Sequence, residues 1–300
     1  MDHRASSKAA EVRRGSAPEP VRLTPGLYVV ATPIGNLRDI TLRALEVLGS
    51  ADLVLCEDTR VTKKLLDRYN LSPRLLAYHD HNAASVRPRV IEELSKGSAV
   101  ALVSDAGTPL ISDPGFKLVE AAVEAGQRVF PIPGASAALA ALVAAGLPTD
   151  RFFFEGFLPP KSTARRTRLS ELRSIPASLV FYESGPRLAE SLSDMSATLG
   201  ARFVAVCREL TKAFEEVRRG SLAELASHYE EAGAPKGEIV VVVSPPNEQV
   251  EFDDADIDSK IKAALKKLSL KDASAAIAAE TGLSRKEVYA RALALAENKK

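Results

Sequence analysis

The sequence predicts an α/β fold with two α/β domains followed by a small all-helical unit, and three observations support this. The 300 residues are 46% hydrophobic, which is ample apolar material for more than one core. Short apolar runs bounded by glycine and proline alternate with helix-like segments through most of the chain. From residue 256 onward, alanine, leucine and lysine dominate and no strand pattern remains. The predicted divisions are a flexible tail at 1–24, an N-terminal α/β domain at 25–135, a C-terminal α/β domain at 136–246, a linker at 247–255 and a helical unit at 256–300.

The N-terminal domain is predicted to hold a buried parallel sheet, because each apolar strand is followed by a helix. Strands are predicted at 27–32, 53–56, 99–103 and 129–132, and helices at 41–48, 62–69, 85–94 and 116–125. The first of these helices has Asp39 or Thr41 as its cap and an apolar stripe of leucines.

The C-terminal domain is predicted to begin with a helix rich in alanine and leucine, followed by a Gly-Leu-Pro turn and further strands. The helix covers 137–145, and the strands cover 152–154, 178–182, 202–207 and 238–243. Pro245-Pro246 and the acidic stretch after it indicate a linker.

Charge and cysteine content narrow the function classes. The formal net charge is only +1, so any nucleic-acid binding has to come from local clusters of cations. Cys56 and Cys207 each lie in or beside an apolar run, which favours buried structural thiols in a reducing compartment. The sequence has neither an apolar run long enough to span a bilayer nor a signal-peptide pattern. We therefore expect a cytoplasmic protein without a membrane partner.

Polar clusters at the ends of predicted strands are the candidate site. They lie at 32–35, 57–60 and 104–107, where parallel α/β sheets bind ligands. Small residues there let the backbone approach a ligand closely, and the Asp105 carboxylate could accept hydrogen bonds from an amino group or a ribose hydroxyl. Such loops suit a cofactor that contains a nucleoside. The plainer alternative is a set of tight turns that only connect strands to helices.

Several common catalytic signatures are absent from the sequence. It contains no P-loop, no G-x-G-x-x-G fingerprint, no nucleophile elbow and no zinc-spaced Cys/His set. His79 and His81, with Asp80 between them, are weak evidence for a metal, and we expect none.

Taken together, the motifs resemble those of the ribosomal RNA small subunit methyltransferase I family, within the tetrapyrrole-methylase-like superfamily. The resemblance covers about residues 25–245 in order. It is carried by the segments at 32–37, 57–60, 79–82, 104–110, 112–115, 146–148, 155–159, 181–184, 208–212 and 236–238. The helical tail is similar to the C-terminal extension of that family. Differences are small, such as Ser184-Gly-Pro-Arg187 where some members have Thr-His.

The resemblance implies a homodimer that binds S-adenosyl-L-methionine in the cleft between the two α/β domains. It also implies transfer of a methyl group to the ribose 2′-oxygen of a cytidine in the decoding region of 16S rRNA, so the small ribosomal subunit is the implied partner. By motif position, the cofactor-binding residues are Pro33, Gly35, Ser104, Asp105, Ala106, Gly107, Thr108, Pro133, Gly134 and Ala135.

A ribose hydroxyl is a poor nucleophile at neutral pH, so a general base would help the transfer. Charged groups in motifs that could face the cleft are the catalytic candidates, namely Glu57, Asp58, Glu183 and Lys212. The sequence does not distinguish among them. An ion pair between Glu57 and Arg60 that only supports the loop is an equally good interpretation.

RNA binding depends largely on contacts to phosphate groups, so cations are the candidates. They are Arg60, the segment with Lys161, Arg165, Arg166 and Arg168, and Arg285 with Lys286 in the tail. The tail has a helix at 271–280, a glycine turn and a second helix opened by the capping-box pattern Ser284-Arg-Lys-Glu287. We therefore expect a helix-turn-helix-like RNA-binding unit at 256–300. The alternatives are a solvated helix face for the first segment and a packing hairpin for the tail.

Two rival functions remain. One is a methylase acting on a porphyrin-like small molecule, which would need neither basic segment. The other is a non-enzymatic DNA-binding regulator built around the helix-turn-helix, which would leave the α/β part without a role.

Overall fold

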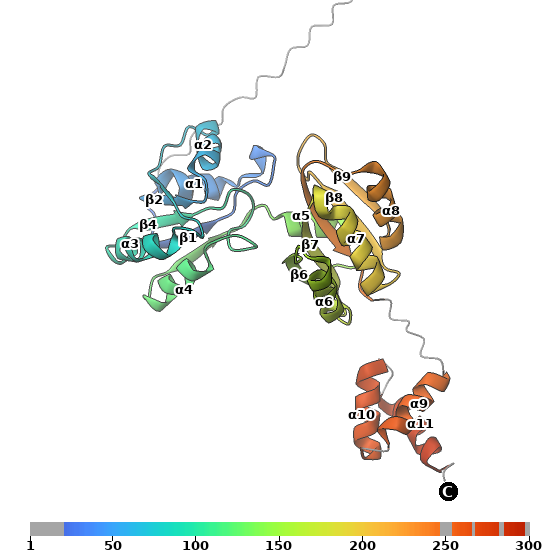
Figure 1. The fold of residues 1–300 in the computed structure, drawn as a ribbon. Coiled ribbons are helices and arrows are strands. Elements are labelled where there is room, and N and C mark those ends of the chain that lie inside the picture. Colours follow the sequence, from blue (N-terminus) through green and yellow to red (C-terminus); the bar gives the residue numbers. More distant parts are fainter. Residues whose placement is uncertain (1–20, 247–253, 266–267, 282–284, 298–300) are drawn as a thin grey trace, which may run out of the picture. The chain divides into compact units, whose positions relative to one another are not determined.

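The computed structural model describes residues 21–246, 254–265, 268–281 and 285–297. It divides into a large unit up to Pro245 and a small unit from Pro246 onward. Figure 1 labels the elements of each unit. The predicted boundary between the two α/β domains remains a prediction. Most of the predicted tail (1–20) and most of the predicted linker (247–253) lie outside the described residues.

The first sheet of the large unit is entirely parallel, as the alternation of strands and helices predicts. Its strands follow the order β3-β2-β4-β1-β5. They are β1 (Gly26–Val30), β2 (Leu53–Cys56), β3 (Leu75–Ala77), β4 (Ala99–Leu102) and β5 (Val129–Ile132). The short edge strand β3 was not predicted.

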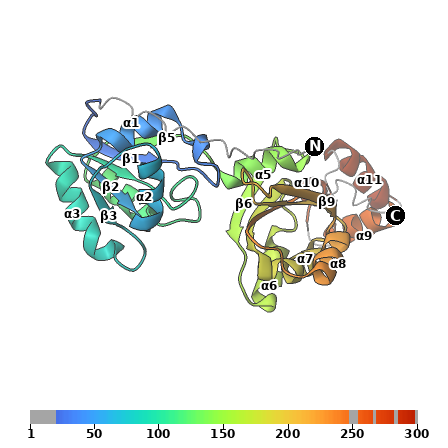
Figure 2. The same cartoon turned by 90° about the horizontal axis from the view of Figure 1, so that it is seen from above.

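Helices cover both faces of this sheet, as Figures 1 and 2 show. The helices are η1 (Leu37–Asp39), α1 (Leu42–Ser50), α2 (Thr59–Arg68), α3 (Ala83–Ser95) and α4 (Phe116–Glu124). Helices α1 and α2 pack in one core cluster, and α3 and α4 pack in another on the opposite face. Thr41 caps α1, one of the two predicted caps. Helix α2 begins three residues before its predicted start, because the Asp58 side chain accepts a hydrogen bond from its first turn.

The second sheet differs from the all-parallel pattern of the first. Its order is β6-β7-β10-β8-β9, and only β6 and β7 pair in parallel. The strands are β6 (Phe152–Phe157), β7 (Ser178–Ser184), β8 (Phe203–Arg208), β9 (Glu216–Ser221) and β10 (Glu238–Val243). Strand β9 was not predicted, since its central residues Arg218 and Arg219 are exposed and give no apolar run.

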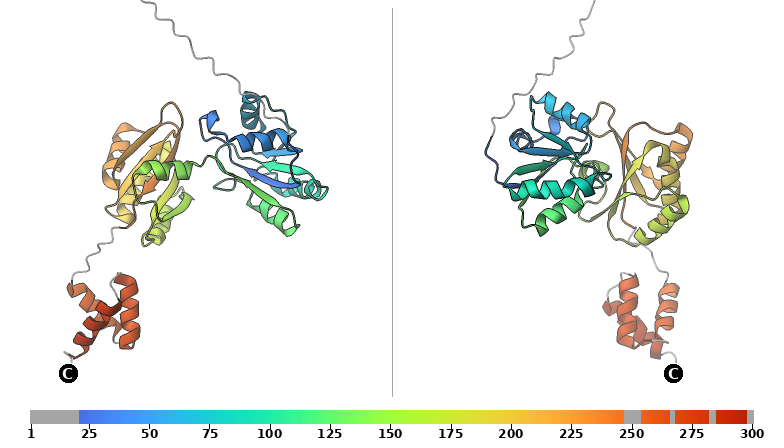
Figure 3. Two further views of the ribbon diagram at one scale, coloured as in Figure 1. Left: turned by 180° about the vertical axis from the view of Figure 1, so that it is seen from behind. Right: turned by 60° about the vertical axis from the view of Figure 1, so that its left-hand side comes forward.

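Three helices cover one face of the second sheet and one helix covers the other. They are α6 (Ser162–Leu172), α7 (Gly185–Leu199) and α8 (Leu222–Ala232) on one side and α5 (Ala137–Ala145) on the other. In the right-hand view of Figure 3 the first three stand along one side of the sheet, coloured from yellow-green to orange. Ile34, from the loop after β1, joins the core cluster around α5. That contact links the first sheet to the second within the large unit.

The small unit consists of α9 (Asp254–Ala264), α10 (Leu270–Thr281) and α11 (Arg285–Glu297). Five buried residues form its core: Ile257, Ile261, Ile277, Val288 and Ala292. The two predicted tail helices therefore exist, and α9 packs with them. Ser284, which opens the predicted capping box, lies outside the described residues.

Residues 21–24, predicted to be part of the flexible tail, are in contact with the first domain. The Val21 amide donates to the Ser50 hydroxyl, and Leu23 packs against the core. Among the residues that the structure describes, no helix has the length and apolarity needed to cross a bilayer.

Candidate active site

Backbone hydrogen bonds join the loops that follow β1 and β4. Thr32 and Gly107 exchange two of them, with N···O distances of 2.8 and 3.0 Å. The Thr32 hydroxyl also donates to the Ser104 carbonyl at 3.2 Å. Gly107 has a φ of +80°, a conformation that glycine adopts without the steric cost of a Cβ atom. The two loops are therefore held in one fixed arrangement.

The loop after β5 is attached to the same arrangement. The Thr108 hydroxyl donates to the Ala135 carbonyl at 3.1 Å. A Cβ atom on Gly134 would lie 3.0 Å from the Cβ of Ala31, so only glycine fits there without displacement. Because β4, β1 and β5 are neighbours in the sheet, their carboxyl ends meet at one edge. The structure thus brings together the three segments predicted to bind the cofactor.

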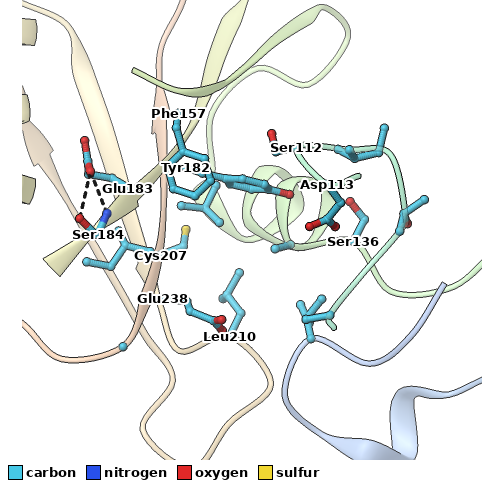
Figure 4. Close-up of a pocket in the computed structure, with 18 of the residues that line it drawn as sticks. Ser112, Asp113, Ser136, Phe157, Tyr182, Glu183, Ser184, Cys207, Leu210 and Glu238 are labelled. Carbon is cyan, nitrogen blue, oxygen red and sulfur yellow. Dashed lines mark hydrogen bonds between the residues drawn. The ribbon is translucent and has the colours of Figure 1, made fainter. Parts of the chain in front are cut away.

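A cavity of about 360 Å³ opens beside these loops, within the range of small-molecule sites. Figure 4 shows its lining. One side comes from loops of the first domain and from the start of α5: Ile34, Asp105, Ala106, Thr108, Ile111, Ser112, Asp113, Ser136 and Ala137. The other side comes from the second sheet and its loops: Phe157, Tyr182, Glu183, Ser184, Cys207, Leu210, Gly237, Glu238, Ile239 and Val240. Of the predicted cofactor-binding residues, Asp105, Ala106 and Thr108 line the cavity. The others lie in the same three loops.

The loop after β8 also contacts the loop after β1. The Asn36 amide donates to the Thr211 hydroxyl at 3.0 Å. A Cβ atom on Gly35 would lie 2.5 Å from Cγ of Lys212, so a larger residue would push this contact apart. Gly35 therefore allows the loop after β1 and the loop after β8 to pack closely against each other.

Acidic side chains gather at the first-domain side of the site. Asp105 accepts a hydrogen bond from the Asp58 amide at 3.1 Å. Burial raises the pKa of Glu57, and the charges of Asp105 and Asp80 raise it further. Burial also raises the pKa of Asp113 to about 6, although a hydrogen bond with Ser104 lowers this pKa in part. The site is therefore suited to a ligand with a positive charge or with several hydrogen-bond donors.

Asp58, a predicted catalytic residue, has a different role in the structure. Its carboxylate accepts from the Arg60 amide at 2.8 Å and pairs with the Arg60 guanidinium at 2.6 Å. These bonds lower the pKa of Asp58 to about 2, which makes it a very weak base. Arg60 thus pairs with Asp58, which corrects the alternative pairing with Glu57. The Arg60 side chain is 87% exposed.

Glu183 and Lys212 are also engaged in contacts of their own. The buried Glu183 carboxylate accepts from the Ser191 hydroxyl at 2.6 Å and from the Ser184 amide at 2.8 Å. Glu183 lines the cavity, but these donors hold its carboxylate in place. The Lys212 ammonium pairs with Glu209 at 2.8 Å and with Glu238 at 2.7 Å. Both charged groups therefore have partners within the protein.

Arg165, predicted to bind RNA, is fully buried. Its guanidinium pairs with Asp194 at 2.6 Å and with Glu190 at 2.8 Å. The helical spacing of α6 places it on the face that packs against α7, so the assignment to RNA is wrong for this residue. Arg166 pairs with Asp194 as well, but its side chain is 55% exposed.

The other predicted RNA-binding cations lie at the surface to different degrees. Lys161 is exposed, whereas Arg168 is held by both oxygens of Glu155 and by Glu171. In the small unit, Arg285 and Lys286 are exposed on α11. In the described part of the chain, His, Cys, Asp and Glu side chains form no cluster of three or more that could hold a metal ion.

Four further residues line the cavity without having been predicted as site residues: Asp113, Ser136, Tyr182 and Cys207. Both cysteines are buried, as expected. Cys207 and Tyr182 lie in apolar strands, where sequence patterns cannot separate a cavity from a core. Asp113 belongs to a Ser-Asp-Pro-Gly turn, and its place shortly after the β4 loop was the available signal.

The sequence of this chain is similar to those of known methyltransferases. Residues 26–226 match the family model described as Tetrapyrrole (Corrin/Porphyrin) Methylases. The chain is 54% identical over 274 residues to "Ribosomal RNA small subunit methyltransferase I" of Mesorhizobium japonicum, covering 91% of this chain and 93% of the relative. The chain belongs to the ribosomal RNA small subunit methyltransferase I family. The protein of the same name from Escherichia coli O157:H7 is 47% identical, covering 89% of this chain and 94% of the relative.

Solved structures support the fold of this family member. Uroporphyrin-III-C-methyltransferase from Thermus thermophilus has a TM-score of 0.53 at 23% identity, covering 73% of this chain and 94% of that one. Diphthine synthase has a TM-score of 0.57 at 20% identity, covering 73% and 89%. Residues 251–296 match the family model described as RsmI C-terminal HTH domain. The predicted α/β body and helical tail are therefore confirmed.

As a member of this family, the chain is an S-adenosylmethionine-dependent methyltransferase. The residues present fit that cofactor. The cavity has apolar walls for a nucleoside, and the glycine and alanine loops leave room for close backbone approach. Asp105 would offer acceptors to amino and hydroxyl groups of the cofactor, and the acidic lining as a whole would favour its positive charge.

Proposed function

We propose that this enzyme transfers a methyl group from S-adenosylmethionine to the ribose 2′-oxygen of a cytidine in small-subunit ribosomal RNA. The observation that carries the proposal is the convergence of the loops after β1, β4 and β5 on one cavity lined by acidic side chains. The relatives named ribosomal RNA small subunit methyltransferase I, similar over about nine-tenths of this chain, support the choice of RNA over a porphyrin-like substrate.

The cofactor, when bound, supplies a methyl carbon on a positively charged sulfur. We propose that Pro33, Gly35, Ser104 to Thr108 and Pro133 to Ala135 form its binding site. The chain's own contribution is positioning, because the tied loops hold the ligand against the second sheet and exclude water from the apolar part of the cavity.

We further propose that exposed cations hold the RNA phosphates. Arg60, Lys161 and Arg166 are the candidates in the large unit, and Arg285 and Lys286 in the small unit. Arg168 contributes less, since two carboxylates already hold its guanidinium. The small unit is proposed to act as an accessory RNA-binding module, as its helix-turn-helix match suggests.

The test is methyl transfer from radiolabelled S-adenosylmethionine to four acceptors: 30S subunits, deproteinised 16S rRNA, uroporphyrinogen III and duplex DNA. We expect label in the rRNA of 30S subunits, and resistance to alkaline cleavage after the modified nucleotide would place the methyl group on the 2′-oxygen. Label in the porphyrin alone would overturn the RNA assignment. Comparing the first two acceptors determines whether the assembled subunit is required.

We also propose a homodimer acting on ribosomal subunits in the cytoplasm. We expect the partner subunit to cover exposed apolar side chains such as Leu42, which is 79% exposed, and Val143, which is 78% exposed. Sedimentation equilibrium measures the mass directly. A single species at the monomer mass of 32.1 kDa across micromolar concentrations would contradict the dimer.

A further inference from the structure

The loop between β4 and α4 has a backbone that costs conformational energy. Leu110 has a φ of +72° and Ser112 a φ of +62°, both in the left-handed region that non-glycine residues seldom adopt. Such residues persist when surrounding contacts over-determine them, and they gather at functional sites. Asp113 immediately follows Ser112 in this loop.

Contacts on both sides hold the loop in this conformation. At its start, the Thr108 hydroxyl donates to the Ala135 carbonyl at 3.1 Å. A Cβ atom on Gly156 would lie 2.7 Å from the Ser112 hydroxyl, so β6 approaches the loop closely. A Cβ atom on Gly115 would lie 2.9 Å from Leu102. These contacts hold the loop backbone on both sides of Asp113.

Asp113 is half-buried and lines the cavity. Figure 4 shows the Tyr182 ring extending from the second sheet toward Asp113 and Ser136. Asp113 and Tyr182 come from opposite sides of the cavity. Burial is the main cause of the raised pKa of Tyr182, and the nearby charge of Asp113 raises it further. The carboxylate is therefore placed where a ligand would meet both sides of the cavity.

The other cavity carboxylates are less suited to accept a proton. Glu183 accepts hydrogen bonds from Ser184 and Ser191 and forms an ion pair with the Arg187 guanidinium at 3.5 Å. Glu238 pairs with Lys212 at 2.7 Å and its side chain is 74% exposed. One carboxylate oxygen of Asp105 accepts a hydrogen bond from the Asp58 amide, and this bond joins two loops. Asp113 has no ion pair among the described residues.

The electrostatics of the site agree with this geometry. The groups that face Asp113 are Glu57 from the β2 loop, Asp105 from the β4 loop, Tyr182 from β7 and the hydroxyl of Ser104. Burial, followed by the charges of Glu57 and Asp105, raises the pKa of Asp113 to about 6, while Ser104 lowers it. A base with a pKa near the working pH is largely ionised and still accepts a proton effectively.

We propose that the Asp113 carboxylate is the general base that accepts the proton of the ribose 2′-hydroxyl during methyl transfer. This inference rests on the proposed function. As the oxygen attacks, the new O–CH₃ bond forms with an oxygen electron pair, and the S–CH₃ bond breaks with its pair left on sulfur. The hydroxyl proton passes to a carboxylate oxygen of Asp113. The products are the methylated ribose, S-adenosylhomocysteine and neutral Asp113, which then releases its proton to solvent.

The first test compares Asp113→Asn with the wild type on 30S subunits. We expect kcat to fall about 100-fold or more, because general-base catalysis contributes on that scale. Cofactor affinity, measured by calorimetry without RNA, should change by less than about threefold. Asp150→Asn, in the exposed turn before β6, is the matched control and should behave as the wild type. Asp113→Glu keeps the carboxylate and should recover part of the rate.

The second test measures proton affinity directly. In the wild type, ¹³C NMR titration should place the Asp113 carboxyl near pH 6, assigned by its loss in Asp113→Asn. The pH profile of kcat/KM should show an acid limb in the wild type and in Asp113→Glu, and none in Asp113→Asn. This readout remains valid if the asparagine variant is unstable, because the wild type and the glutamate variant both report it.

Three results would overturn the inference while leaving the proposed function intact. They are a kcat unchanged in Asp113→Asn, a loss confined to cofactor affinity, and an ordinary carboxyl pKa in the titration. Failure of the wild type to methylate 30S subunits would instead reject the proposed function itself. Because the wild type is measured in the same assay, the two failures are distinguishable.

Discussion

The Asp58 amide donates to the Asp105 carboxylate across 3.1 Å and joins the loop after β2 to the loop after β4. The same Asp58 caps α2 with its side chain, so one residue fixes both the helix start and the neighbouring acidic loop. Asp105 is therefore held in position while its second carboxylate oxygen remains available to a ligand.

Replacing Asp105 with alanine should weaken S-adenosylmethionine binding about tenfold or more, the scale of a lost hydrogen bond to a charged group. Calorimetry on the purified protein measures this. The folded state should survive, because Asp105 is exposed. An unchanged dissociation constant would show that this carboxylate does not contact the cofactor.

Gly107→Ala tests the fixed turn beside Thr32. Alanine at a φ of +80° should cost about 1–2 kcal/mol of stability and displace the loop that lines the cavity. The matched control is Gly126→Ala, where φ is +69° and no atom lies within 4 Å of the new Cβ. Both variants should lose similar stability in urea unfolding, but only Gly107→Ala should lose cofactor affinity. Equal affinities in the two variants would argue against a role for this turn in binding.

Arg165 and Arg166 are adjacent in sequence but should respond differently to truncation. Arg165→Ala removes the fully buried partner of the buried Asp194 and should lower the free energy of unfolding by about 3–5 kcal/mol. Arg166→Ala removes a half-exposed partner and should cost about 1 kcal/mol or less. Unlike Arg165→Ala, Arg166→Ala should weaken RNA binding directly, because its side chain is exposed. Comparable stability losses in urea would contradict the burial of Arg165.

The pH dependence of stability should reflect Asp194. Burial alone would raise the pKa of this carboxyl, but hydrogen bonds from Arg166, Arg165 and Ser162 outweigh it and lower the pKa. A lowered folded-state pKa adds stability above the unfolded value of about 3.9, and this stability is lost as the pH falls through the folded-state value. Urea midpoints of the wild type should therefore drop more steeply below about pH 4 than those of Asp194→Asn. Parallel pH curves would rule out this contribution.

The cations of α11 test whether the small unit binds RNA or only packs. Arg291 pairs with Asp258 at 2.6 Å and supports packing, whereas Arg285 and Lys286 are exposed. The double variant Arg285→Ala/Lys286→Ala should weaken 30S binding and reduce the slope of log affinity against log salt by roughly 1–2. Lys96→Ala, an exposed cation paired with Glu92 on α3, is the control. A slope equal to that of the wild type would favour the packing role.

Local sequence patterns were sufficient for most of the architecture. Apolar runs between turn residues located β1, β2, β4, β5 and β10, because buried parallel strands and central strands have continuous apolar sequences. The same patterns missed β9, whose central arginines are exposed, and gave no direction of pairing for the second sheet. Pairing direction depends on long connections that no local pattern records.

The chain order of the motifs was enough to identify the family and the loops at the strand ends, since these depend on residues close together in sequence. The roles of individual charges were decided by tertiary contacts. Arg165 became structural because α6 turns it toward Asp194. Asp58 caps helix α2. Asp113 and Tyr182 line one cavity although they come from loops and strands on its opposite sides. Burial and partners set the charge and reach of an ionisable side chain, and both depend on segments that meet only after the chain has folded.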